Sequence, residues 1–256
     1  LAGAGALVAE RGGTALLGAV GGAIERFDLA ASAAEPRSRG HRGEVRSVAF
    51  SPDGSRFASV GDGGRMILRE TVSGRTVAVV DAGCGALRDV AMARDLSGPN
   101  VVRGLLRRLL TLRQRGAVLV AGCEDGRVRW WSASDGALQR TSEGHAAAVL
   151  SLDFSPDERV LATGSQDGTV RLWSAADGSL LAVVDHHDGP VWDLEFSADG
   201  GSLLTNAGRT VEAHDLATDA TTVKIPSARS SGFAVDPGGR WLERRSGTRE
   251  RRSTNF

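Results

Sequence analysis

The sequence is poor in several features that mark particular classes of protein. It has no tyrosine, only two cysteines, and a single lysine, Lys224, among its 31 lysine and arginine residues. Two cysteines cannot build the multi-disulfide framework of a small secreted protein. Because 31 acidic residues balance the basic ones, the formal net charge is zero, and no field of one sign attracts nucleic acid or an anionic membrane. No apolar run of about 18 residues occurs, so we expect no transmembrane helix.

The remaining composition is that of a folded globular protein. Hydrophobic residues make up 41% and charged residues 24% of the 256 residues, unlike the balance in disordered chains. This length suits one large all-β domain or two smaller domains. The excess of arginine over lysine suits a GC-rich genome. We also expect a bacterial source. The chain begins at Leu1, so we expect a processed chain or a piece of a longer one.

A repeat with a period of 42 residues runs through most of the chain. Its clearest mark is a histidine followed at fixed spacing by an apolar residue, a phenylalanine and an aspartate. His145 and His187 are 42 residues apart, whereas His41 and His145 are 104 apart, which is two periods and 20 further residues. We therefore expect a hidden copy with an insertion of 20 residues between them. The visible copies begin with residues 40–53, 144–157 and 186–199.

The hidden copy is recognisable in its second half. Residues 119–136 match residues 161–178 at an offset of 42, with an Asp-Gly pair, a tryptophan and a second Asp-Gly pair in the same order. Its start matches weakly, with Gly83 in place of the histidine. Each copy predicts four short strands joined by turns, in which Asp-Gly pairs supply the positive φ of tight hairpins. In the best copy the strands are predicted at 149–154, 160–165, 169–173 and 180–184.

A four-stranded sheet of this kind cannot bury both of its faces alone. Stacking several copies around an axis buries them and leaves only short exposed edges. The period, Gly-His, Ser-Pro-Asp-Gly, Asp-Gly-x-Val-x-Leu-Trp and the closing Trp-Ser pair together resemble the WD40-repeat family. The resemblance covers roughly residues 15–242 and implies an all-β, WD40-type β-propeller of four-stranded blades. The function it implies is a rigid, non-catalytic platform for contacts with other proteins.

We expect a single β-propeller domain or propeller fragment, incomplete or with five to six blades. Residues 16–30 indicate the middle strands of an earlier blade, and residues 233–242 the first strand of a later one. These end strands could share one blade and close a five-bladed ring, or the chain could be a piece of a larger propeller. We favour the piece, because the chain begins at Leu1 and its last residues show no pattern. The expected units are a partial blade 1–39, blade 40–81, blade 82–143 with the insertion 97–116, blade 144–185, blade 186–226, a partial blade 227–242 and a basic tail 243–256.

In the family that the sequence resembles, a histidine, a strand hydroxyl, an aspartate and a tryptophan form a buried hydrogen-bond network. The resemblance assigns this structural tetrad to His145, Thr163, Asp167 and Trp173. An indole N–H can only donate, a hydroxyl can donate and accept, and a carboxylate can accept from the imidazole. Because the set recurs with the repeat, we interpret it as structural and not as a catalytic triad.

The other blades keep only parts of this set, so we expect blade 144–185 to be the firmest. Blade 40–81 has His41 and Ser59, but Asp62 is one position early and Arg69 replaces the tryptophan. Blade 82–143 has Asp125 and Trp131 but Gly83 and Ala121 in the other two places. Blade 186–226 has His187 and Thr205, lacks the aspartate, and places His214 at the tryptophan position.

Two further groups of residues invite a chemical interpretation. Residues 185–188 are Asp-His-His-Asp, but the repeat accounts for His187, so we predict no metal ligands and no cofactor. Cys84 and Cys123 map to the same end of their blade and could lie close together. We interpret them as two small residues near a strand end in preference to a redox pair. No P-loop, HExxH or GxSxG pattern occurs, and we expect no enzymatic activity.

The loops before the first strand and between the second and third strands of every blade are expected to share one face of the propeller. Loops on a rigid scaffold carry function, and arginine and tryptophan are enriched among the residues that dominate interfaces. Arg46 and Trp192 occupy equivalent positions in two blades, so we expect them to line the same mouth. The alternative is a set of solvated loop residues. The predicted protein-binding face consists of Glu44, Arg46, Arg65, Arg127, Asp188, Trp192 and Arg209.

The insertion predicts a basic amphipathic helix of about 15 residues. A Ser-Gly-Pro-Asn turn precedes apolar residues at i, i+3, i+4 and i+7, from Val102 to Leu109. We expect this inserted α-helix to pack on the flank of the propeller, with docking of a partner or contact with a membrane surface or nucleic acid as alternatives. The arginines of the inserted basic helix include Arg103, Arg107, Arg108 and Arg113.

The leading functional hypothesis is a scaffold for protein–protein interactions within a larger regulatory or signalling protein. We expect a cytoplasmic location and, as partners, other proteins or domains of a parent chain, with neither nucleic acid nor membrane as the main partner. One alternative is an enzyme acting at the central channel, which would need a cluster of His, Asp or Glu at the channel mouth. Another is nucleic-acid or membrane-surface binding through the inserted basic helix.

Overall fold

The computed structural model describes residues 8–11, 14–18, 23–28, 33–34, 38–94, 117–184, 187–218, 220–226, 230–235, 241–245 and 253–254. Every regular element in this part of the chain is a β-strand. None of the described residues belongs to a helix that is long and apolar enough to cross a membrane. The insertion that we expect to be helical, residues 97–116, lies outside the described residues, between the end of β10 at Arg94 and the start of β11 at Ala117.

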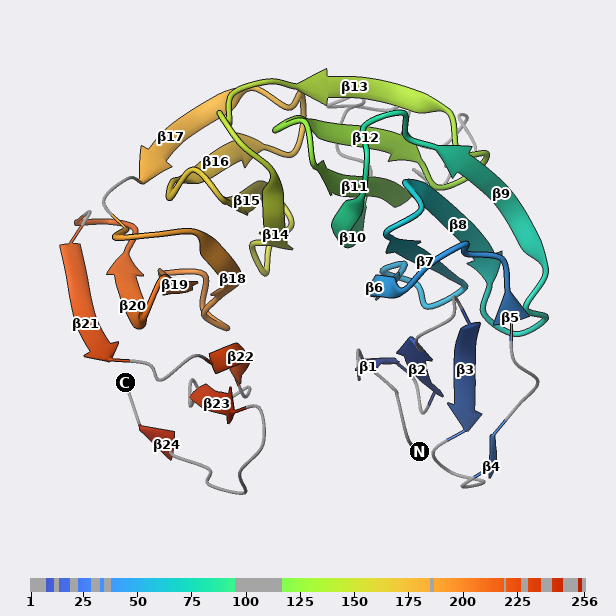
Figure 1. Cartoon of the computed structure of the whole chain (residues 1–256), viewed down its shortest axis with the longest axis horizontal. Coiled ribbons are helices and arrows are strands. Elements are labelled where there is room, and N and C mark those ends of the chain that lie inside the picture. Colours follow the sequence, from blue (N-terminus) through green and yellow to red (C-terminus); the bar gives the residue numbers. More distant parts are fainter. Residues whose placement is uncertain are drawn as a thin grey trace, which may run out of the picture.

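The strands form six antiparallel sheets, called blades 1 to 6 below, which stand around a central axis (Figure 1). Blade 1 contains β1 (Val8–Arg11), β2 (Thr14–Gly18), β3 (Ala23–Asp28), β4 (Ala33–Ala34) and β5 (Ser38–Arg39). Blade 2 contains β6 (Val45–Phe50), β7 (Arg56–Gly61), β8 (Arg65–Glu70) and β9 (Thr76–Asp81). Blade 3 contains β10 (Leu87–Arg94), β11 (Ala117–Cys123), β12 (Val128–Ser132) and β13 (Leu138–Ser142).

Blades 4 to 6 continue the same plan. Blade 4 contains β14 (Val149–Phe154), β15 (Val160–Ser165), β16 (Val170–Ser174) and β17 (Leu180–Val184). Blade 5 contains β18 (Val191–Phe196), β19 (Ser202–Ala207), β20 (Thr210–Asp215) and β21 (Ala220–Pro226). Blade 6 contains β22 (Ser230–Val235), β23 (Trp241–Arg245) and β24 (Ser253–Thr254). In blades 2 to 5 the strands pair in chain order, with the first strand nearest the axis and the fourth at the rim (Figure 1).

The all-β fold of antiparallel blades agrees with the sequence prediction. The four strands predicted for blade 144–185 lie within one residue of β14 to β17 at every end. The fit is good because Asp-Gly pairs mark two of the turns, and Gly168 and Gly178 both have the positive φ that such turns need.

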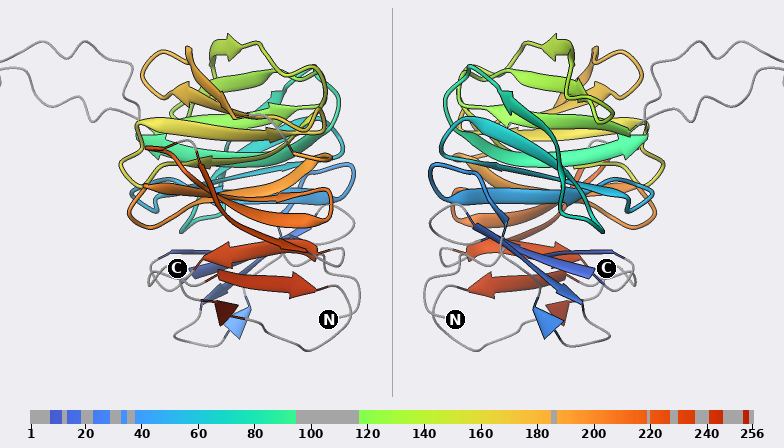
Figure 2. Two further views of the ribbon diagram at one scale, coloured as in Figure 1. Left: turned by 90° about the vertical axis from the view of Figure 1, so that its left-hand side faces the viewer. Right: turned by 90° about the vertical axis from the view of Figure 1, so that its right-hand side faces the viewer.

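The described strands at the two ends of the chain do not share a blade. Strands β1 to β5 and β22 to β24 form separate sheets, and no described strand of one pairs with a strand of the other. Figures 1 and 2 show blade 1 at one end of the arc and blade 6 at the other, facing each other. A five-bladed ring closed by one shared blade is therefore not what the structure shows. The segment 243–256 also contains strand residues, because β23 runs to Arg245 and β24 pairs with β23 through main-chain hydrogen bonds, which need no side-chain pattern.

The hydrophobic core is divided into layers, each between two consecutive blades. Trp130 and Trp173, from blades 3 and 4, are 0% and 2% exposed and belong to one such layer. Truncating a buried tryptophan to alanine destabilises a protein by about 3–5 kcal/mol, so these residues hold adjacent blades together. The layer between blades 2 and 3 contains Val60, Met66, Leu68, Leu87, Leu119 and Trp131. The layer between blades 4 and 5 contains Ala162, Val170, Val191, Leu194 and Leu203.

Partly buried carboxylates link the innermost strands across the core layers. The Leu152 N–H on β14 donates to Asp89 Oδ2 on β10 at 2.9 Å, and the Phe196 N–H on β18 donates to Asp153 Oδ2 on β14 at 2.9 Å. Removal of these carboxylates from water raises the pKa of both, and that of Asp153, which also feels the charge of Asp89, rises to about 6. Each aspartate therefore joins its own blade to the next one along the chain.

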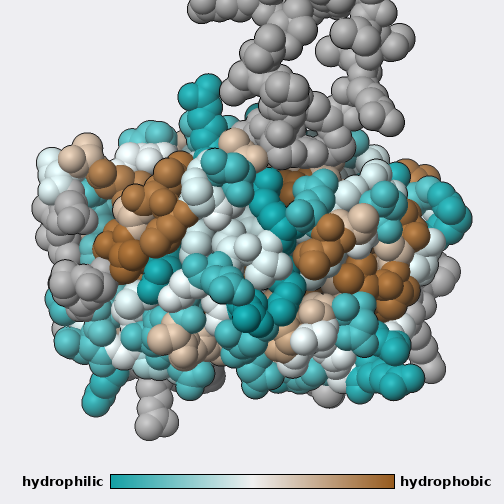
Figure 3. Space-filling view, turned by 90° about the horizontal axis from the view of Figure 1, so that it is seen from above, coloured by the Kyte–Doolittle hydropathy of each residue, from teal (hydrophilic) through white to brown (hydrophobic). Residues whose placement is uncertain are grey.

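The rim of the propeller carries apolar side chains. Figure 3, which views the molecule from above Figure 1, shows apolar residues gathered in separate patches among polar ones. The exposed large hydrophobic residues on the outermost strands are Val79, Leu138, Leu180, Leu181 and Val183.

Glycine can be required because the backbone has a positive φ, or because there is no space for a Cβ atom. Gly83 and Gly126 separate these two reasons. Gly126, in the turn between β11 and β12, has φ +80°, and a Cβ there would lie 2.5 Å from the carbonyl oxygen of His145 in the next blade. Gly83, in the loop between β9 and β10, has φ +62°, but a Cβ there would meet no other atom within 4 Å. Gly83→Ala therefore introduces backbone strain alone, whereas Gly126→Ala adds a clash between blades.

We predict that Gly83→Ala lowers the free energy of unfolding by about 1–2 kcal/mol. Gly126→Ala is expected to lower it by a further ~1–3 kcal/mol, because the main chain of the next blade must move. Urea denaturation of both variants and the unchanged protein measures the difference. Equal losses in the two variants would show that the contact between blades at Gly126 adds nothing.

Candidate functional site

Two segments meet at one end of each of blades 2 to 5: the loop that leads into the innermost strand, and the turn between the second and third strands. Main-chain contacts or hydrogen bonds hold them together, so the residues of the predicted face do share one end of their blades. The Asp62 N–H donates to Glu44 O at 3.2 Å in blade 2, Gln166 N–H to Ala148 O at 2.9 Å in blade 4, and Gly208 N–H to Pro190 O at 3.0 Å in blade 5.

The innermost strands of these blades all begin with a shift in pairing register. Such a β-bulge leaves a residue unpaired and re-aims its side chain out of the normal alternation of the strand. The shift lies between Val45 and Ser47 in blade 2 and contains Arg46, and in blade 3 it lies between Leu87 and Val90 and contains Arg88 and Asp89. In blade 4 it lies between Val149 and Ser151 and contains Leu150, and in blade 5 it lies between Val191 and Asp193 and contains Trp192.

Three of these bulge side chains are large and reach solvent. The side chains of Arg46 and Arg88 are each 36% exposed, and Trp192 is 54% exposed. Asp62 connects the two arginines, because its Oδ1 lies 2.8 Å from Arg46 Nε and 3.6 Å from Arg88 Nη1. The hydrogen bond from Arg46 lowers the pKa of Asp62 and keeps it ionised. The bulges thus present a linked pair of cations and, in blade 5, an indole.

Arg88 was absent from the predicted face, although the repeat could have identified it. It follows Arg46 by one period of 42 residues, as the sequence alone shows. The weak match at the start of the hidden copy, where Gly83 replaces the histidine, concealed this equivalence.

Three of the other predicted residues of the face form local ion pairs. Glu44 Oε2 lies 3.2 Å from Arg46 Nη2, Arg127 Nε lies 2.9 Å from Glu143 Oε1, and Asp188 Oδ2 lies 3.8 Å from Lys224 Nζ. Arg65 is half-buried at the start of β8, and Arg209 is exposed in the turn between β19 and β20. Exposed pairs of this kind contribute about 0–1 kcal/mol to stability, so the face carries charges of both signs that a partner can compete for.

The four side chains of the predicted tetrad are joined by a continuous chain of hydrogen bonds in blade 4. Trp173 Nε1 donates to Thr163 Oγ1 at 2.8 Å, and Thr163 Oγ1 lies 2.8 Å from His145 Nε2. His145 Nδ1 lies 3.2 Å from Asp167 Oδ2. Because the indole can only donate and the carboxylate can only accept, the protons run from Trp173 through Thr163 and His145 to Asp167.

Burial sets the protonation of this network. It lowers the pKa of His145 to about 4, although Asp167 opposes the shift. Burial acts in the opposite sense on Asp167, but hydrogen bonds from Thr169 and from the Ala146 N–H outweigh it and lower the pKa of this carboxyl to about 2. At neutral pH the imidazole is therefore neutral and the carboxylate charged, which fits the direction of the hydrogen bonds. All four groups are engaged with one another, as a structural role requires.

Blade 2 holds only half of this network. His41 Nε2 lies 2.7 Å from Ser59 Oγ, while Asp62, one position early, turns outward to Arg46. Burial, with the nearby charges of Arg69 and Arg65, lowers the pKa of His41 to about 4. The shifted aspartate therefore serves the face described above and not the interior.

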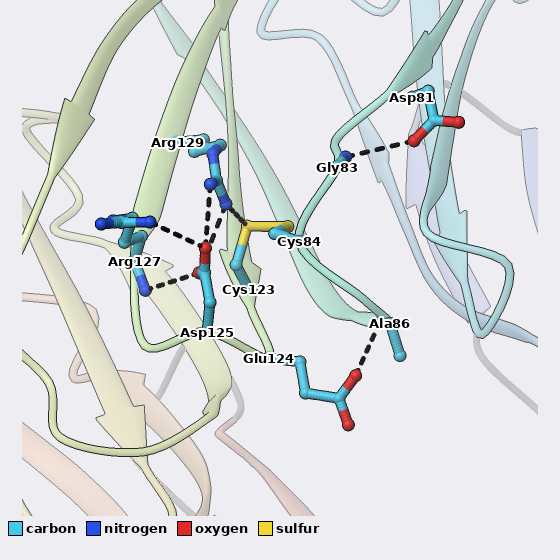
Figure 4. The surroundings of a disulfide bond; sticks show 9 residues. All are labelled: Asp81, Gly83, Cys84, Ala86, Cys123, Glu124, Asp125, Arg127 and Arg129. Atoms are coloured by element: carbon cyan, nitrogen blue, oxygen red, sulfur yellow. Dashed lines mark hydrogen bonds and ion pairs between the residues drawn. A yellow bond between two sulfur atoms is a disulfide. The ribbon is translucent and has the colours of Figure 1, made fainter.

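Blade 3 replaces the histidine and hydroxyl by a covalent bond. Cys84, in the loop before β10, and Cys123, at the end of β11, form a disulfide with a Cα–Cα distance of 5.8 Å (Figure 4). Arg129 Nη2 lies 2.9 Å from Asp125 Oδ2 beside this bond, and Glu124 Oε2 accepts the Ala86 N–H at 3.0 Å. The two cysteines are close, as their positions in the repeat suggested, but our preference for two unlinked small residues was wrong. The disulfide joins the same two segments that His145 and Asp167 join in blade 4.

Catalysis at the central axis would need polar groups that are free to act. Asp89 and Asp153, on the innermost strands, each accept a main-chain N–H from the next blade. Their hydrogen bonds give them a structural task. The arginines of the predicted inserted helix, Arg103, Arg107, Arg108 and Arg113, lie outside the described residues.

Comparison with known proteins identifies the repeat. The family model for the WD domain, G-beta repeat, matches residues 35–68, 136–174 and 178–215, so these three segments carry WD40 repeats. It is also similar to the small ribosomal subunit protein RACK1y of Oryza sativa subsp. japonica, with 30% identity over 122 residues. That match covers 37% of this chain and 36% of the relative, so the chain spans about a third of its length. Because this relative is from a plant, a bacterial source remains a prediction.

The histidines of the network are expected to make stability depend on pH. Between pH 6.5 and about 4 an unfolded histidine is protonated, whereas His145 in the folded chain is not, because its pKa lies at about 4. The unfolded state then binds more protons, so the free energy of unfolding falls as the pH falls. We predict that the unchanged protein loses about 2 kcal/mol more than His145→Gln between pH 7 and pH 5, measured by urea denaturation. Equal losses would mean that His145 is protonated alike in both states.

The disulfide predicts a defined thiol chemistry. Alkylation of the denatured protein without reductant is expected to modify neither Cys84 nor Cys123, and after reduction both, as read by mass spectrometry. The bond closes a loop with a sequence separation of 39 residues, so Cys84→Ala/Cys123→Ala is expected to destabilise the fold by roughly 2–4 kcal/mol. Reductant supplies the control, since it should reproduce this loss in the unchanged protein and leave the double variant unaffected. Two free thiols before reduction would contradict the assignment.

Proposed function

We propose that the chain is a non-catalytic WD40-repeat scaffold that binds another protein through the face formed by the loops into β6, β10, β14 and β18. The observation that carries the proposal is the recurrence of a bulge at the start of each of these strands. Its side chains Arg46, Arg88 and Trp192 are all at least one-third exposed. A bulge on a paired, buried strand holds its side chain rigidly, which reduces the entropy lost on binding.

The residue types at these positions suit a protein partner. Tryptophan and arginine dominate the binding energy of protein interfaces, and half-exposed tryptophan has apolar area to bury. The surrounding charges are of both signs, with Glu44 and Asp62 beside the arginines and Asp188 before β18. A partner surface with mixed charge and an apolar pocket matches this face better than the uniform negative charge of nucleic acid or membrane.

The proposal of a non-catalytic role rests on how the polar groups are used. The His145, Thr163 and Asp167 set, which imitates a triad, is bound up in hydrogen bonds within blade 4. A catalytic serine or threonine needs an exposed hydroxyl, whereas Thr163 is 0% exposed.

We place the protein in the cytoplasm as part of a larger regulatory or signalling chain, whose other domains are among its partners. Disulfides are rare in reducing compartments, so a Cys84–Cys123 bond that persists in cells would contradict this location, whereas reduced thiols there would support it. Trapping thiols in intact cells before lysis would report the state of the pair where the protein works.

Affinity capture with a matched pair of variants tests the face. Trp192 is 54% exposed on the face and Leu181 is 55% exposed on the rim, so each substitution to alanine removes a comparable exposed apolar group. We predict that Trp192→Ala weakens partner capture at least tenfold and that Arg46→Ala/Arg88→Ala weakens it in a salt-dependent way. Leu181→Ala is expected to capture partners as the unchanged protein does.

Two results would contradict this assignment. If Leu181→Ala lost the partners that Trp192→Ala retained, the rim would be the binding surface. If the captured material were a ribosomal particle, as the name of the rice relative suggests for that protein, and the three face variants all retained it, the face would not be the contact.

A further inference from the structure

We propose that His187, Glu212 and His214 form a binding site for a divalent transition-metal ion, with zinc as the best-suited ion, in the interior of blade 5. One ligand atom from each residue lies within 4.8 Å of the other two. Two histidines and one glutamate are a ligand set that binds zinc and leaves a fourth position for water or another ligand. This inference does not depend on the binding face proposed above.

The site arises where blade 5 departs from the repeat. His214 pairs with Leu203 as Trp173 pairs with Leu161 in blade 4, so His214 occupies the position of the tetrad tryptophan. In the same register Glu212 pairs with Thr205, as Arg171 pairs with Thr163. At these two positions blade 4 has an indole and a guanidinium, neither of which binds metals. Blade 5 has an imidazole and a carboxylate there instead.

The three side chains converge on one carboxylate oxygen. Glu212 Oε2 lies 3.4 Å from His187 Nδ1 and 3.7 Å from His214 Nε2. In a tetrahedral site with bonds of 2.0–2.2 Å, neighbouring ligand atoms are about 3.3–3.5 Å apart. The two imidazole rings stand nearly perpendicular, at 83° with 5.1 Å between their centroids, so each offers a nitrogen without stacking on the other. A small contraction of the existing arrangement would seat an ion.

The second oxygen of the carboxylate is held from outside. Lys224 Nζ lies 2.9 Å from Glu212 Oε1, and Thr210 Oγ1 donates to the same oxygen at 2.9 Å. Hydrogen bonds of this kind orient the carboxylates that bind metals. They leave Oε2 directed at the two histidines.

The strongest sign of a missing ligand is the buried imidazole of His187. Its side chain is 1% exposed, its Nδ1 has only the 3.4 Å contact with Glu212 Oε2, and its Nε2 has no hydrogen-bond partner among the described residues. The equivalent histidine of blade 4, His145, has partners on both nitrogens. Leaving a buried polar atom unsatisfied is destabilising by about 1–3 kcal/mol, and a metal bond would satisfy it.

The competing explanation is a plain salt bridge, in which Lys224 alone balances the charge of Glu212. Lys224 is half-exposed and can swing into solvent when an ion binds. The two explanations predict different effects of zinc on the stability of the folded protein. Zinc stabilises the protein if the three residues form a metal site and has no effect if they form only a salt bridge.

Zinc titration of the metal-free protein against a chromogenic chelator, in buffer without reductant, tests the site. Oxidising conditions keep Cys84 and Cys123 paired, so they cannot supply thiolate ligands. We expect one equivalent of zinc to bind, and Co²⁺ in its place to give the visible absorption of tetrahedral coordination. His187→Gln, Glu212→Gln and His214→Gln are each expected to weaken binding at least tenfold, and His145→Gln, the matched histidine of blade 4, to leave it unchanged.

Thermal unfolding with and without zinc keeps the test decisive if a histidine variant folds poorly. Glu212→Gln preserves the shape of the side chain, and we expect it to lose the zinc-dependent rise in Tm that the unchanged protein and His145→Gln show. No stoichiometric binding by the unchanged protein would overturn the site. Binding retained in Glu212→Gln and His187→Gln, or binding that requires reduced cysteines, would overturn it equally.

Discussion

The fold depends on one local constraint, which is that the loop leading into each innermost strand must be fastened to the turn between the second and third strands. The described blades meet this constraint with different chemistry. Blade 4 uses the hydrogen bonds from His145 to Asp167, blade 3 a disulfide, and blade 2 a main-chain bond beside the Arg46–Asp62 pair. In blade 5 His187 faces Glu212 across the same junction. Each blade therefore carries its own fastening, although Cys84 and Cys123 also belong to the core layer between blades 2 and 3.

The repeat allowed the fold to be predicted because its signals are local. Asp-Gly turns and alternating apolar residues define strands such as β14 to β17 without reference to distant contacts. Two features could not be obtained that way. Pairing of Cys84 with Cys123 depends on the distance between a loop and a strand end, and convergence on Glu212 depends on a cross-strand register. The resemblance to the repeat assigned positions in blade 5 to His187 and His214. It gave no role to Glu212, which lies two residues before His214.

The bulges explain why the binding face could be located only in part. Arg46 and Trp192 were recognisable as equivalent positions, yet the sequence contains no mark of a bulge at either. The structure shows that the pairing shift is the common property, and Arg88 shares it in a blade whose histidine is missing. Position in the repeat determines where a bulge occurs, while the residue within it varies from cation to indole to Leu150. This separation lets the scaffold stay constant while its surface changes.

The buried groups of the propeller respond to acid in two opposite ways, one for the aspartates on the innermost strands and one for the histidines. The pKa of Asp153 is raised to about 6, so its ionisation opposes folding at neutral pH and that opposition fades as the pH falls toward 4. His41 and His145, farther from the axis, have lowered pKa values and weaken the fold over the same interval. Mild acidification therefore removes unfavourable buried charge near the channel while loosening the loops around it.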